Sequence, residues 1–450
     1  MQTGRLQDRC IIKRGRAGSA NLTRRGFLRV LVSLTAAKLA GASSGALAAA
    51  PVRAALGVAH GFPRLMGMNI GAKNYDSPSY QAQIARLDAV VLNFYPGWGG
   101  ERSQEAMRAV VRNLKGLNPS LLVGQYTVLS EAYDPADRRY ADRDKSQKVE
   151  QVGWWLRDDR GKRVQWTSRY DAWEVNITEW SRPDDEGLRY PAWLARRDLQ
   201  TYFAPIPELD IWYVDNALSK PAVDAADWDG DGRRDLASEA RISTAHRRGH
   251  AAHWGAIKER RPGILIVGNS DDLSSPEFTG RLQGAFLEAV IGKSWSMERW
   301  RGWEAVMDRY HKAMRDTSAP HLVGFNVWGK ADDYQRMRYG LTSCLLGDGY
   351  FSYTDEAVGY SSVPWFDEYE ADLGRPVDPP QTSAWQNGVY RRRFERGLVL
   401  VNPTPSRNAV RLEGGHGRML GQQDALTNNG ERVTTLELLG KDGLVLKADR

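Results

Sequence analysis

The sequence predicts an α/β protein in which a (β/α)8 TIM barrel is followed by a small antiparallel β domain. Eight strand-like runs alternate with longer amphipathic segments, and each run is apolar along its whole length. Such runs are typical of parallel strands that are covered on both faces. After about residue 380, short alternating runs separated by Gly, Asn and Pro indicate antiparallel strands.

The expected strands and helices follow one another in this order along the chain. The strands are predicted at 64–71, 88–98, 120–129, 210–216, 263–269, 282–290, 321–329 and 348–354. Helices are expected at 103–115, 237–260, 298–315 and 331–346. An open doubly wound sheet is the alternative, but no glycine-rich phosphate loop follows any of these strands, which favours the barrel.

Three regions are predicted from these patterns. Residues 1–48 read as an export signal, 60–378 as the catalytic barrel, and 383–450 as a β-sandwich-like domain. The linker is expected at Asp378-Pro379-Pro380. The net charge of +7 is concentrated in residues 1–50, and without that segment it falls to −1. The charge therefore does not indicate a nucleic-acid partner.

The N-terminal segment resembles a twin-arginine (Tat) signal. Arg24 and Arg25 precede a weakly apolar stretch, and Ala46-Leu47-Ala48 offers small residues for cleavage. Lys38 inside that stretch argues against a transmembrane anchor. We therefore expect the Tat translocase as a partner during export and a periplasmic or secreted location. A basic disordered tail is the alternative interpretation.

Polar and aromatic side chains gather where the predicted strands end, which is where TIM barrels carry their chemistry. Asp215 ends the apolar run DIWYVD, and Glu288 ends GAFLE. The residues expected to bind substrate around them are Asn93, Tyr95, Trp98, Tyr126, Asn216, Asn269, Asp271, Trp295, Asn326, Trp328 and Asp348. The chain also has 16 Trp against 10 Phe, and the flat, partly polar indole suits a sugar ring.

Two carboxylates that face one another across a pocket are what glycosidic bond cleavage requires. One stays ionised and attacks the anomeric carbon or activates water, and the other protonates the leaving oxygen. We assign Asp215 as nucleophile or base and Glu288 as general acid, with no cofactor required. In the alternative, each carboxylate only ends its strand by pairing with an arginine or a backbone amide. The barrel would then bind carbohydrate without cleaving it, in polysaccharide assembly or export.

Two further clusters could bind metal. The sequence DWDGDGRRD places Asp227, Asp229, Asp231 and Asp235 at calcium-loop spacing, although the usual glutamate is missing from its last position. Structural calcium and a solvated Asp/Gly turn both fit this pattern. His246, His250 and His253 fall on one face of a predicted helix, where we expect a surface face in preference to a zinc site.

Several stretches resemble the hypothetical glycosyl-hydrolase-like TIM barrels, which are distantly similar to polygalactosaminidase-type barrels. The resemblance runs from about residue 64 to the C-terminus. Its stretches are IGAKNYD, LDAVVLNFYPGW, GQYTV, WWLRDDRGKRV, IWYVDNA, DWDGDG, IVGNSD, GAFLEAV, LLGDGYFSY and GLVLVNPT with DGLVL. It implies a glycosidase acting on an oligosaccharide or polysaccharide, with the acids at Asp215 and Glu288. The order of these acids is also similar to that in retaining α-galactosidase-like barrels.

Overall fold

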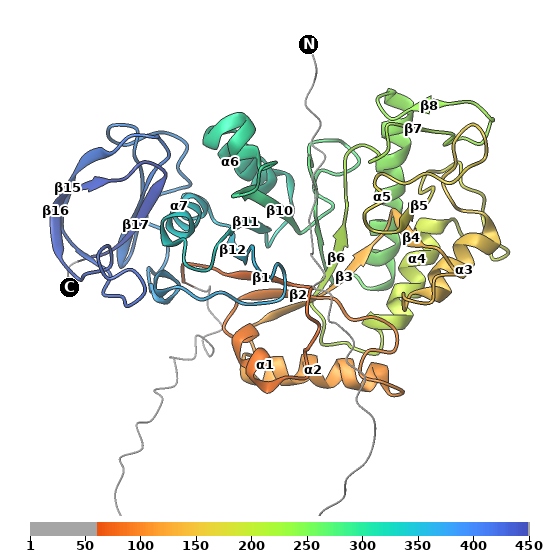
Figure 1. The fold of residues 1–450 in the computed structure, drawn as a ribbon, viewed down its shortest axis with the longest axis horizontal. Helices are drawn as coiled ribbons and strands as arrows, with labels where there is room; N and C mark the ends of the chain where they lie inside the picture. The colour runs from red at the N-terminus through yellow and green to blue at the C-terminus, as the bar shows by residue number, and fades with distance from the viewer. Residues whose placement is uncertain (1–60, 449–450) are drawn as a thin grey trace, which may run out of the picture.

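The computed structural model describes residues 61–448 and confirms the TIM-type barrel. One sheet holds eight parallel strands in the order β1-β2-β3-β6-β9-β10-β11-β12, in the middle of the molecule (Figure 1). Their bounds are β1 Met66–Asn69, β2 Ala89–Leu92, β3 Leu122–Val128, β6 Ile211–Asp215, β9 Leu265–Gly268, β10 Gly284–Ile291, β11 Leu322–Gly329 and β12 Tyr350–Asp355. The expected signal, residues 1–48, lies outside the described residues.

The barrel strands are buried on both faces, as their apolar runs predict. Ala89 and Val91 of β2 point into an inner cluster that also contains Met66 and Met68, whereas Val90 and Leu92 join an outer cluster beneath the helices. Successive side chains of a strand point to opposite faces. A strand between two apolar layers therefore needs an apolar residue at nearly every position.

Helices cover the outer layer, with one exception. The helices between successive strands are α1 Pro78–Ile84, α2 Ser103–Leu117, α5 Ala240–Arg260, α6 Met297–Asp316 and α7 Tyr334–Leu345. The connection from β9 to β10, residues 269–283, contains no helix, so the expected regular alternation is wrong at this point. In its place, α6 and the outer side of β10 line a pocket of about 300 Å³.

A long insertion between β3 and β6 stands beside the C-terminal edge of the barrel (Figure 1). Its elements are β4 Glu131–Tyr133, α3 Arg143–Val152, β5 Ala172–Glu174, α4 Tyr190–Asp198 and the π-helical turn η1 Leu199–Phe203. β4 and β5 pair antiparallel. The connection from β6 to α5 adds a two-residue pair, β7 Ala225–Ala226 with β8 Asp235–Leu236.

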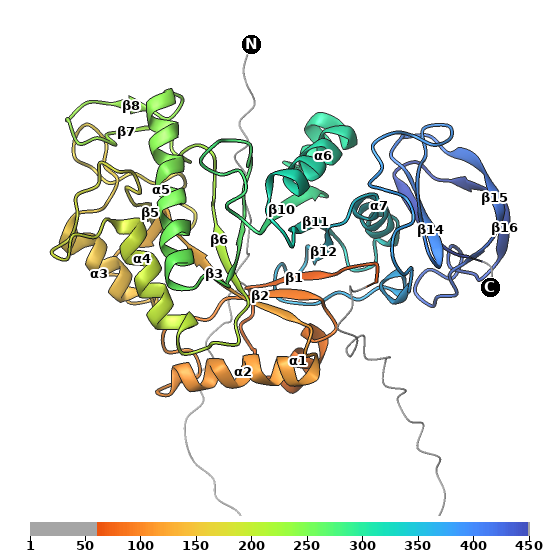
Figure 2. The same cartoon turned by 180° about the vertical axis from the view of Figure 1, so that it is seen from behind.

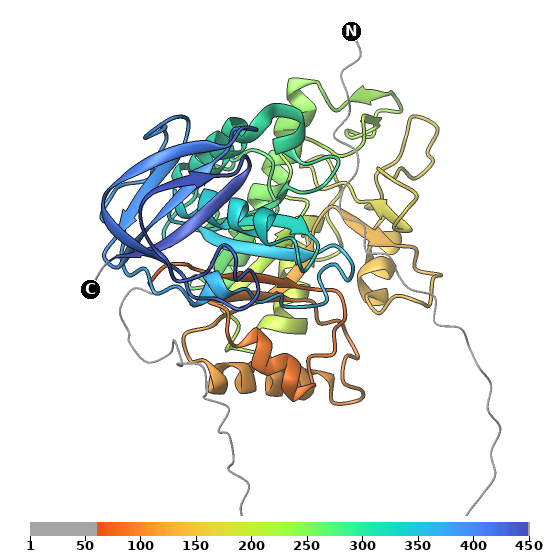
Figure 3. The same cartoon turned by 60° about the vertical axis from the view of Figure 1, so that its left-hand side comes forward.

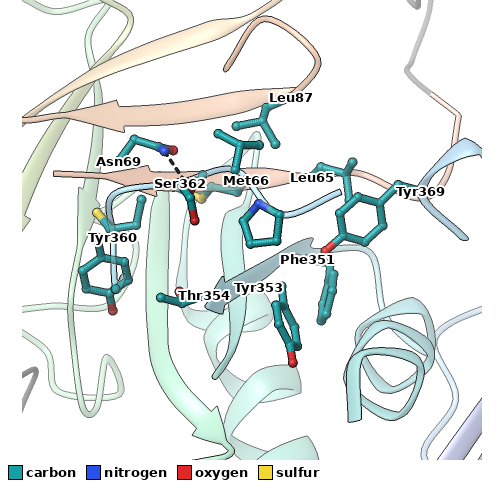
Figure 4. Close-up of a pocket in the computed structure, with 15 residues that line it drawn as sticks. Leu65, Met66, Asn69, Leu87, Phe351, Tyr353, Thr354, Tyr360, Ser362 and Tyr369 are labelled. Atoms are coloured by element: carbon teal, nitrogen blue, oxygen red, sulfur yellow. Dashed lines mark hydrogen bonds between the residues drawn. The ribbon is translucent and has the colours of Figure 1, made fainter. Parts of the chain in front are cut away.

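The barrel closes incompletely between its first and last strands. A parallel bridge joins Leu65 to Phe351, and the Phe351 N–H donates to the Arg64 carbonyl at 2.8 Å. Beyond this bridge a cavity of about 20 Å³ lies between β1, β12 and the chain that follows β12 (Figure 4). We call residues 356–364, which pass along this opening, the strap.

The C-terminal region forms the expected small antiparallel domain. Its single five-stranded sheet has the order β13-β14-β17-β15-β16 and lies beside α7 (Figures 2 and 3). The strands are β13 Tyr390–Phe394, β14 Gly397–Asn402, β15 Asn408–Arg418, β16 Arg432–Leu438 and β17 Asp442–Ala448. Val399, Val401 and Val445 join the apolar layer of the barrel, whereas Leu398 and Leu400 belong to a separate cluster on the other face.

Two buried arginines connect the barrel to this sheet. Arg338 of α7 is 3% exposed and forms a bidentate pair with Asp442 at 3.0 and 3.1 Å, and its Nη1 lies 2.5 Å from Asp424. Arg392 of β13 donates to the carbonyls of Leu345 and Gly347 at the end of α7. The last carbonyls of a helix have no partner inside the helix, so Arg392 supplies one from the other domain.

The buried face of α5 carries His246, His250 and His253, so the prediction that they form a surface face is wrong. All three are at most 5% exposed, because this side of α5 packs against α4 and, through His253, against Trp212 of β6. His253 Nδ1 lies 2.9 Å from the Pro191 carbonyl of α4. Burial lowers the pKa of His253 to about 4 and that of His246 to about 3.

Lowering the pH from 7 to 5 should reduce the free energy of unfolding by about 2 kcal/mol for each of His246 and His253. Their folded pKa values lie below the ordinary 6.5. Between pH 6.5 and about 4 the unfolded chain therefore binds protons that the folded chain does not. The free energy of unfolding consequently decreases as the pH is lowered through this range. Urea unfolding followed by tryptophan fluorescence measures this loss. His253→Gln should remove one histidine's share of it, and an unchanged pH dependence would contradict the prediction.

No helix of the described region, residues 61–448, has the length and apolar character needed to cross a bilayer.

Candidate active site

Three neighbouring strands bring the central residues of the site together at the C-terminal edge of the barrel. Asp215 is the last residue of β6, Asn269 directly follows β9, and Glu288 lies in the second half of β10. β9 stands between β6 and β10 in the sheet. Asn269 is therefore placed between the two carboxylates, and all three side chains are half-buried.

The amide of Asn269 bridges the two acids. Its Nδ2 donates to Asp215 Oδ1 at 3.0 Å and to Glu288 Oε2 at 3.0 Å. An amide nitrogen has two hydrogens at about 120°, and only this end of the side chain can donate to a carboxylate. Both hydrogens are used here. Because each accepting oxygen is 3.0 Å from the same nitrogen, the two oxygens are at most about 6 Å apart.

Hydrogen-bond donors hold the carboxylate of Asp215 in place. Its Oδ2 accepts from the Tyr126 hydroxyl at 2.5 Å, and its Oδ1 accepts from the backbone N–H of Asn216 at 2.9 Å. Asn216 has a left-handed backbone, with φ of 51°, which turns its N–H back toward the carboxylate. Burial and the charge of Asp215 together raise the pKa of Tyr126 well above its ordinary value. Tyr126 therefore stays protonated and donates to Asp215.

A β-bulge positions Glu288. The register of β10 with β11 shifts between Leu287 and Ile291, and Ala289 has φ of 45°. The side-chain oxygen of Asn326 accepts from the Ala289 N–H at 3.0 Å, and the Ser296 hydroxyl donates to the Ala289 carbonyl at 2.6 Å. Bulges re-aim a side chain near active sites. This one holds Glu288 toward Asn269.

The structure brings some of the predicted residues together with the acids. Tyr126, Asn216 and Asn269 lie in this hydrogen-bond network. Asn326 is wholly buried and supports the bulge. Trp295 is half-buried and packs against the inner cluster of the barrel. Trp328 is 1% exposed, with Lys293 Nζ 3.8 Å from its ring centroid.

Other predicted residues lie farther out. Asn93 follows β2, and its N–H donates to the Tyr75 hydroxyl. Tyr95 is exposed and carries Lys73 over its ring. Trp98 packs in the core beside Tyr75, and its indole N–H donates to the Lys73 carbonyl.

Asp271 holds two loops together near the site. Its carboxylate accepts from the backbone N–H and the hydroxyl of Ser219, at 2.7 and 2.9 Å. It thereby connects the loop after β9 to the loop after β6.

Asp348 does not join the site, which corrects the expectation for this residue. It precedes β12 and therefore lies at the opposite, N-terminal end of the barrel. There it accepts from Arg392 at 2.7 Å. The sequence predicts a strand over 348–354, whereas β12 starts at Tyr350. Asp348 therefore belongs to the turn that leads into the strand.

Two site residues escaped prediction. The Tyr360 hydroxyl, from the strap, donates to Glu288 Oε1 at 2.6 Å. Glu131 of β4 accepts from the side-chain amide of Asn216 and from the indole N–H of Trp166, both at 2.8 Å. Glu131 thus ties the insertion to the tip of β6. Neither residue ends an apolar barrel run, and this is the sequence pattern that indicates Asp215, Glu288 and Asn269.

The Asp/Gly loop forms an acidic cluster between β7 and β8. Carboxylate oxygens of Asp227, Asp229 and Asp235 lie within 4.8 Å of one another. Asp231 turns away and accepts from the Arg233 N–H. Arg241 pairs with Asp229 at 2.6 Å and with Asp235. Burial raises the pKa of Asp235.

A parallel barrel with an Asp and a Glu linked at its C-terminal edge is the arrangement expected of a TIM-barrel glycoside hydrolase. The model of the hypothetical glycosyl hydrolase family 15 matches residues 115–398, which include both acids. The chain belongs to this family. No curated protein sequence matches it.

Several solved structures match this chain at low sequence identity. Amy13B of Eubacterium rectale has 8% sequence identity and a TM-score of 0.51, over 87% of this chain and 97% of that one. An α-amylase from Lactobacillus plantarum has 11% identity and a TM-score of 0.47, over 86% and 99%. The glycoside hydrolase domain of PelA from Pseudomonas aeruginosa has 12% identity and a TM-score of 0.39, over 67% and 99%. At these identities the likeness to Amy13B concerns the fold alone.

Proposed function

We propose that the protein is an exported, retaining glycoside hydrolase that cleaves a polysaccharide such as an exopolysaccharide or an envelope glycan. Asp215 is the nucleophile and Glu288 the acid/base residue. The observation that carries this proposal is the Asn269 amide, which donates one hydrogen to each acid. Two acids that each had only a structural role in their own strand would not need a shared hydrogen-bond donor.

The separation of the acids supports retention of configuration. Retaining enzymes hold their carboxyl groups about 5–5.5 Å apart, whereas inverting enzymes need about 6.5–9.5 Å to admit a water molecule. The oxygens bound to Asn269 are each 3.0 Å from the same nitrogen. These two oxygens therefore cannot be more than about 6 Å apart, a spacing that favours the retaining arrangement over the inverting one.

The hydrogen bonds support the division of roles. Asp215 accepts hydrogen bonds from Tyr126, Asn216 and Asn269, and these three donors fix the orientation of the attacking carboxylate. Its oxygen attacks the anomeric carbon while the bond to the leaving oxygen breaks and Glu288 gives that oxygen its proton. Glu288 then takes a proton from water, and the resulting hydroxide displaces Asp215 from the sugar.

The test is to incubate the purified protein with bacterial exopolysaccharides, envelope glycans and plant polysaccharides and to measure new reducing ends. Proton NMR of the products during the first minutes identifies the anomer that forms first. We expect the anomeric configuration of the cleaved bond to be kept. An inverted first product would contradict the nucleophilic role of Asp215, and binding to a polysaccharide without release would favour the carbohydrate-binding alternative.

Export by the Tat translocase to the periplasm or the medium is part of the proposal. It is supported by Arg24 and Arg25 ahead of the weakly apolar stretch. A reporter fused after residue 55 should be exported, and changing both arginines to lysine should stop export. Unchanged export of the double variant would contradict the Tat route.

We also propose calcium as a structural ligand of the Asp/Gly loop. Oxygen ligands from several carboxylates suit Ca²⁺, and three of them converge here with one arginine between them. Asp227, Asp229 and Asp235 would hold the ion, with Arg241 displaced toward solvent. The ion would neutralise the surplus negative charge of the loop that follows Asp215.

Millimolar calcium should raise the melting temperature by about 2–4 °C, as a stabilisation of about 1 kcal/mol does in a large domain, and EDTA should reverse this. Asp229→Asn should abolish the response. Differential scanning calorimetry measures it. A melting temperature that ignores both calcium and EDTA would show that the loop is an ordinary Asp/Gly turn.

A further inference from the structure

Tyr360 contacts Glu288, the proposed acid/base residue, but belongs to the strap and not to a barrel strand. It lies 72 residues from Glu288 in sequence, and its side chain is only 3% exposed. Its hydroxyl lies 2.6 Å from Glu288 Oε1, while Asn269 occupies Oε2. Each oxygen of the Glu288 carboxyl group therefore has a different partner.

The opening between β1 and β12 gives the strap its place. The Gly71 N–H donates to the Tyr360 carbonyl at 2.9 Å, and the Asn69 side chain donates to the Ser362 carbonyl at 3.1 Å (Figure 4). By passing along this opening, the strap replaces part of the missing contact between β1 and β12. Its backbone is thus held from β1, the strand on the far side of the opening.

Glycine at position 71 allows this close approach. A Cβ there would lie 2.2 Å from Ser361 Oγ and 3.0 Å from the Tyr360 carbonyl oxygen. The Tyr360 ring also packs edge-on against Trp328, with centroids 5.1 Å apart at 73°. The ring is consequently fixed from two sides, which fixes the position of its hydroxyl.

The two partners of Glu288 differ in what they can do when the carboxyl group changes protonation. The Asn269 amide nitrogen can only donate, so it favours the carboxylate. A tyrosine hydroxyl donates to a carboxylate and accepts from a carboxylic acid. In a retaining reaction the acid/base residue loses a proton and regains one in each cycle. Tyr360 is the partner that can keep its hydrogen bond in both states.

We propose that Tyr360 is a positioning residue for Glu288, which holds one carboxyl oxygen through both halves of the reaction and stabilises the ionised form. This inference rests on the proposed role of Glu288. Other titratable groups near that carboxyl group include Asp215 across Asn269, Tyr126 on the far side of Asp215, and Lys293 over Trp328. None of them is altered by the variants used below.

The test is an infrared titration of the Glu288 carboxyl group in the wild type and in Tyr360→Phe, with Glu288→Gln identifying the band. Loss of the donor should raise the pKa of Glu288 by about one unit, because a hydrogen bond to a charged group stabilises that form. Tyr353→Phe is the matched control, since its hydroxyl donates to the Lys330 carbonyl at 2.8 Å and touches no carboxylate. It should leave the band unchanged.

Gly71→Ala provides a second variant, which keeps the hydroxyl but pushes the strap away from β1. It should move the Glu288 titration in the same direction as Tyr360→Phe. With a substrate, the alkaline limb of the kcat/KM profile should move to higher pH by the same amount in Tyr360→Phe, and kcat should fall about tenfold.

An unchanged titration of Glu288 in folded Tyr360→Phe or Gly71→Ala would overturn the inference. The infrared readout needs no substrate, so it decides the role of Tyr360 even if no polysaccharide is cleaved. Conversely, sugar release that Glu288→Gln abolishes, together with an unchanged titration in Tyr360→Phe, would leave the proposed function standing and refute only the positioning role.

Discussion

Asp215→Asn and Glu288→Gln should each lower kcat/KM on the cleaved polysaccharide by at least about 10³-fold, since acid–base catalysis alone contributes about 10²–10⁴-fold. The first change removes the attacking oxygen charge, and the second removes the proton donor. Both side chains keep nearly the same shape, so binding to the polysaccharide should change little. Reducing-end release and binding to the immobilised polysaccharide measure the two effects separately.

The matched control for these variants is Asp272→Asn, which makes the same chemical change nearby. Asp272 is an exposed acid in the loop after β9 and pairs with Lys312 at 2.9 Å. Exposed ion pairs contribute little, so its activity should stay near that of the wild type. Equal activity of all four proteins would show that Asp215 and Glu288 have only a structural role.

Arg338→Met should lower the free energy of unfolding by about 3–5 kcal/mol, because removing one partner leaves buried charges without compensation. Arg338 is 3% exposed and faces Asp442, Asp424 and Glu368. Burial already raises the pKa of Asp442 and of Glu368. Without the guanidinium these carboxyl groups would take up protons more readily, and the loss of stability should therefore be larger at pH 8 than at pH 6.

Arg336→Met on the same helix is the control for Arg338. Arg336 pairs with Asp333 at 3.3 Å in a partly exposed position, where an ion pair contributes about 1 kcal/mol or less. Denaturant unfolding of both variants compares the two sites. Equal stability losses would mean that the buried network contributes no more than a surface pair.

The barrel could be predicted because its physical requirements leave a direct trace in the sequence. A strand between two apolar layers needs an unbroken apolar run, and runs such as residues 321–329 correspond closely to β11, Leu322–Gly329. The insertion was harder to predict. Its short strands, such as Glu131–Tyr133, are polar and pair only locally, so no periodic signal marks them.

The candidate site was predictable to the extent that its polar residues interrupt or end apolar barrel runs. Asp215 and Glu288 interrupt apolar runs, and the structure places them on either side of Asn269. Their catalytic role stays a prediction. Tyr360 and Glu131 come from connections, where tyrosine and glutamate are unremarkable, and their positions depend on how those connections fold back. The carbonyl contact of Tyr360 with Gly71 spans almost the whole barrel sequence.

The attachment of the C-terminal sheet to α7 has a consequence for how this enzyme could be divided or recombined. Val399, Val401 and Val445 complete the apolar layer of the barrel, and Arg392 supplies donors to the carbonyls at the end of α7. A polypeptide trimmed after β12 would expose that layer and leave those carbonyls without a donor. The catalytic unit therefore has to be expressed, and exchanged between family members, with its C-terminal sheet as one indivisible piece.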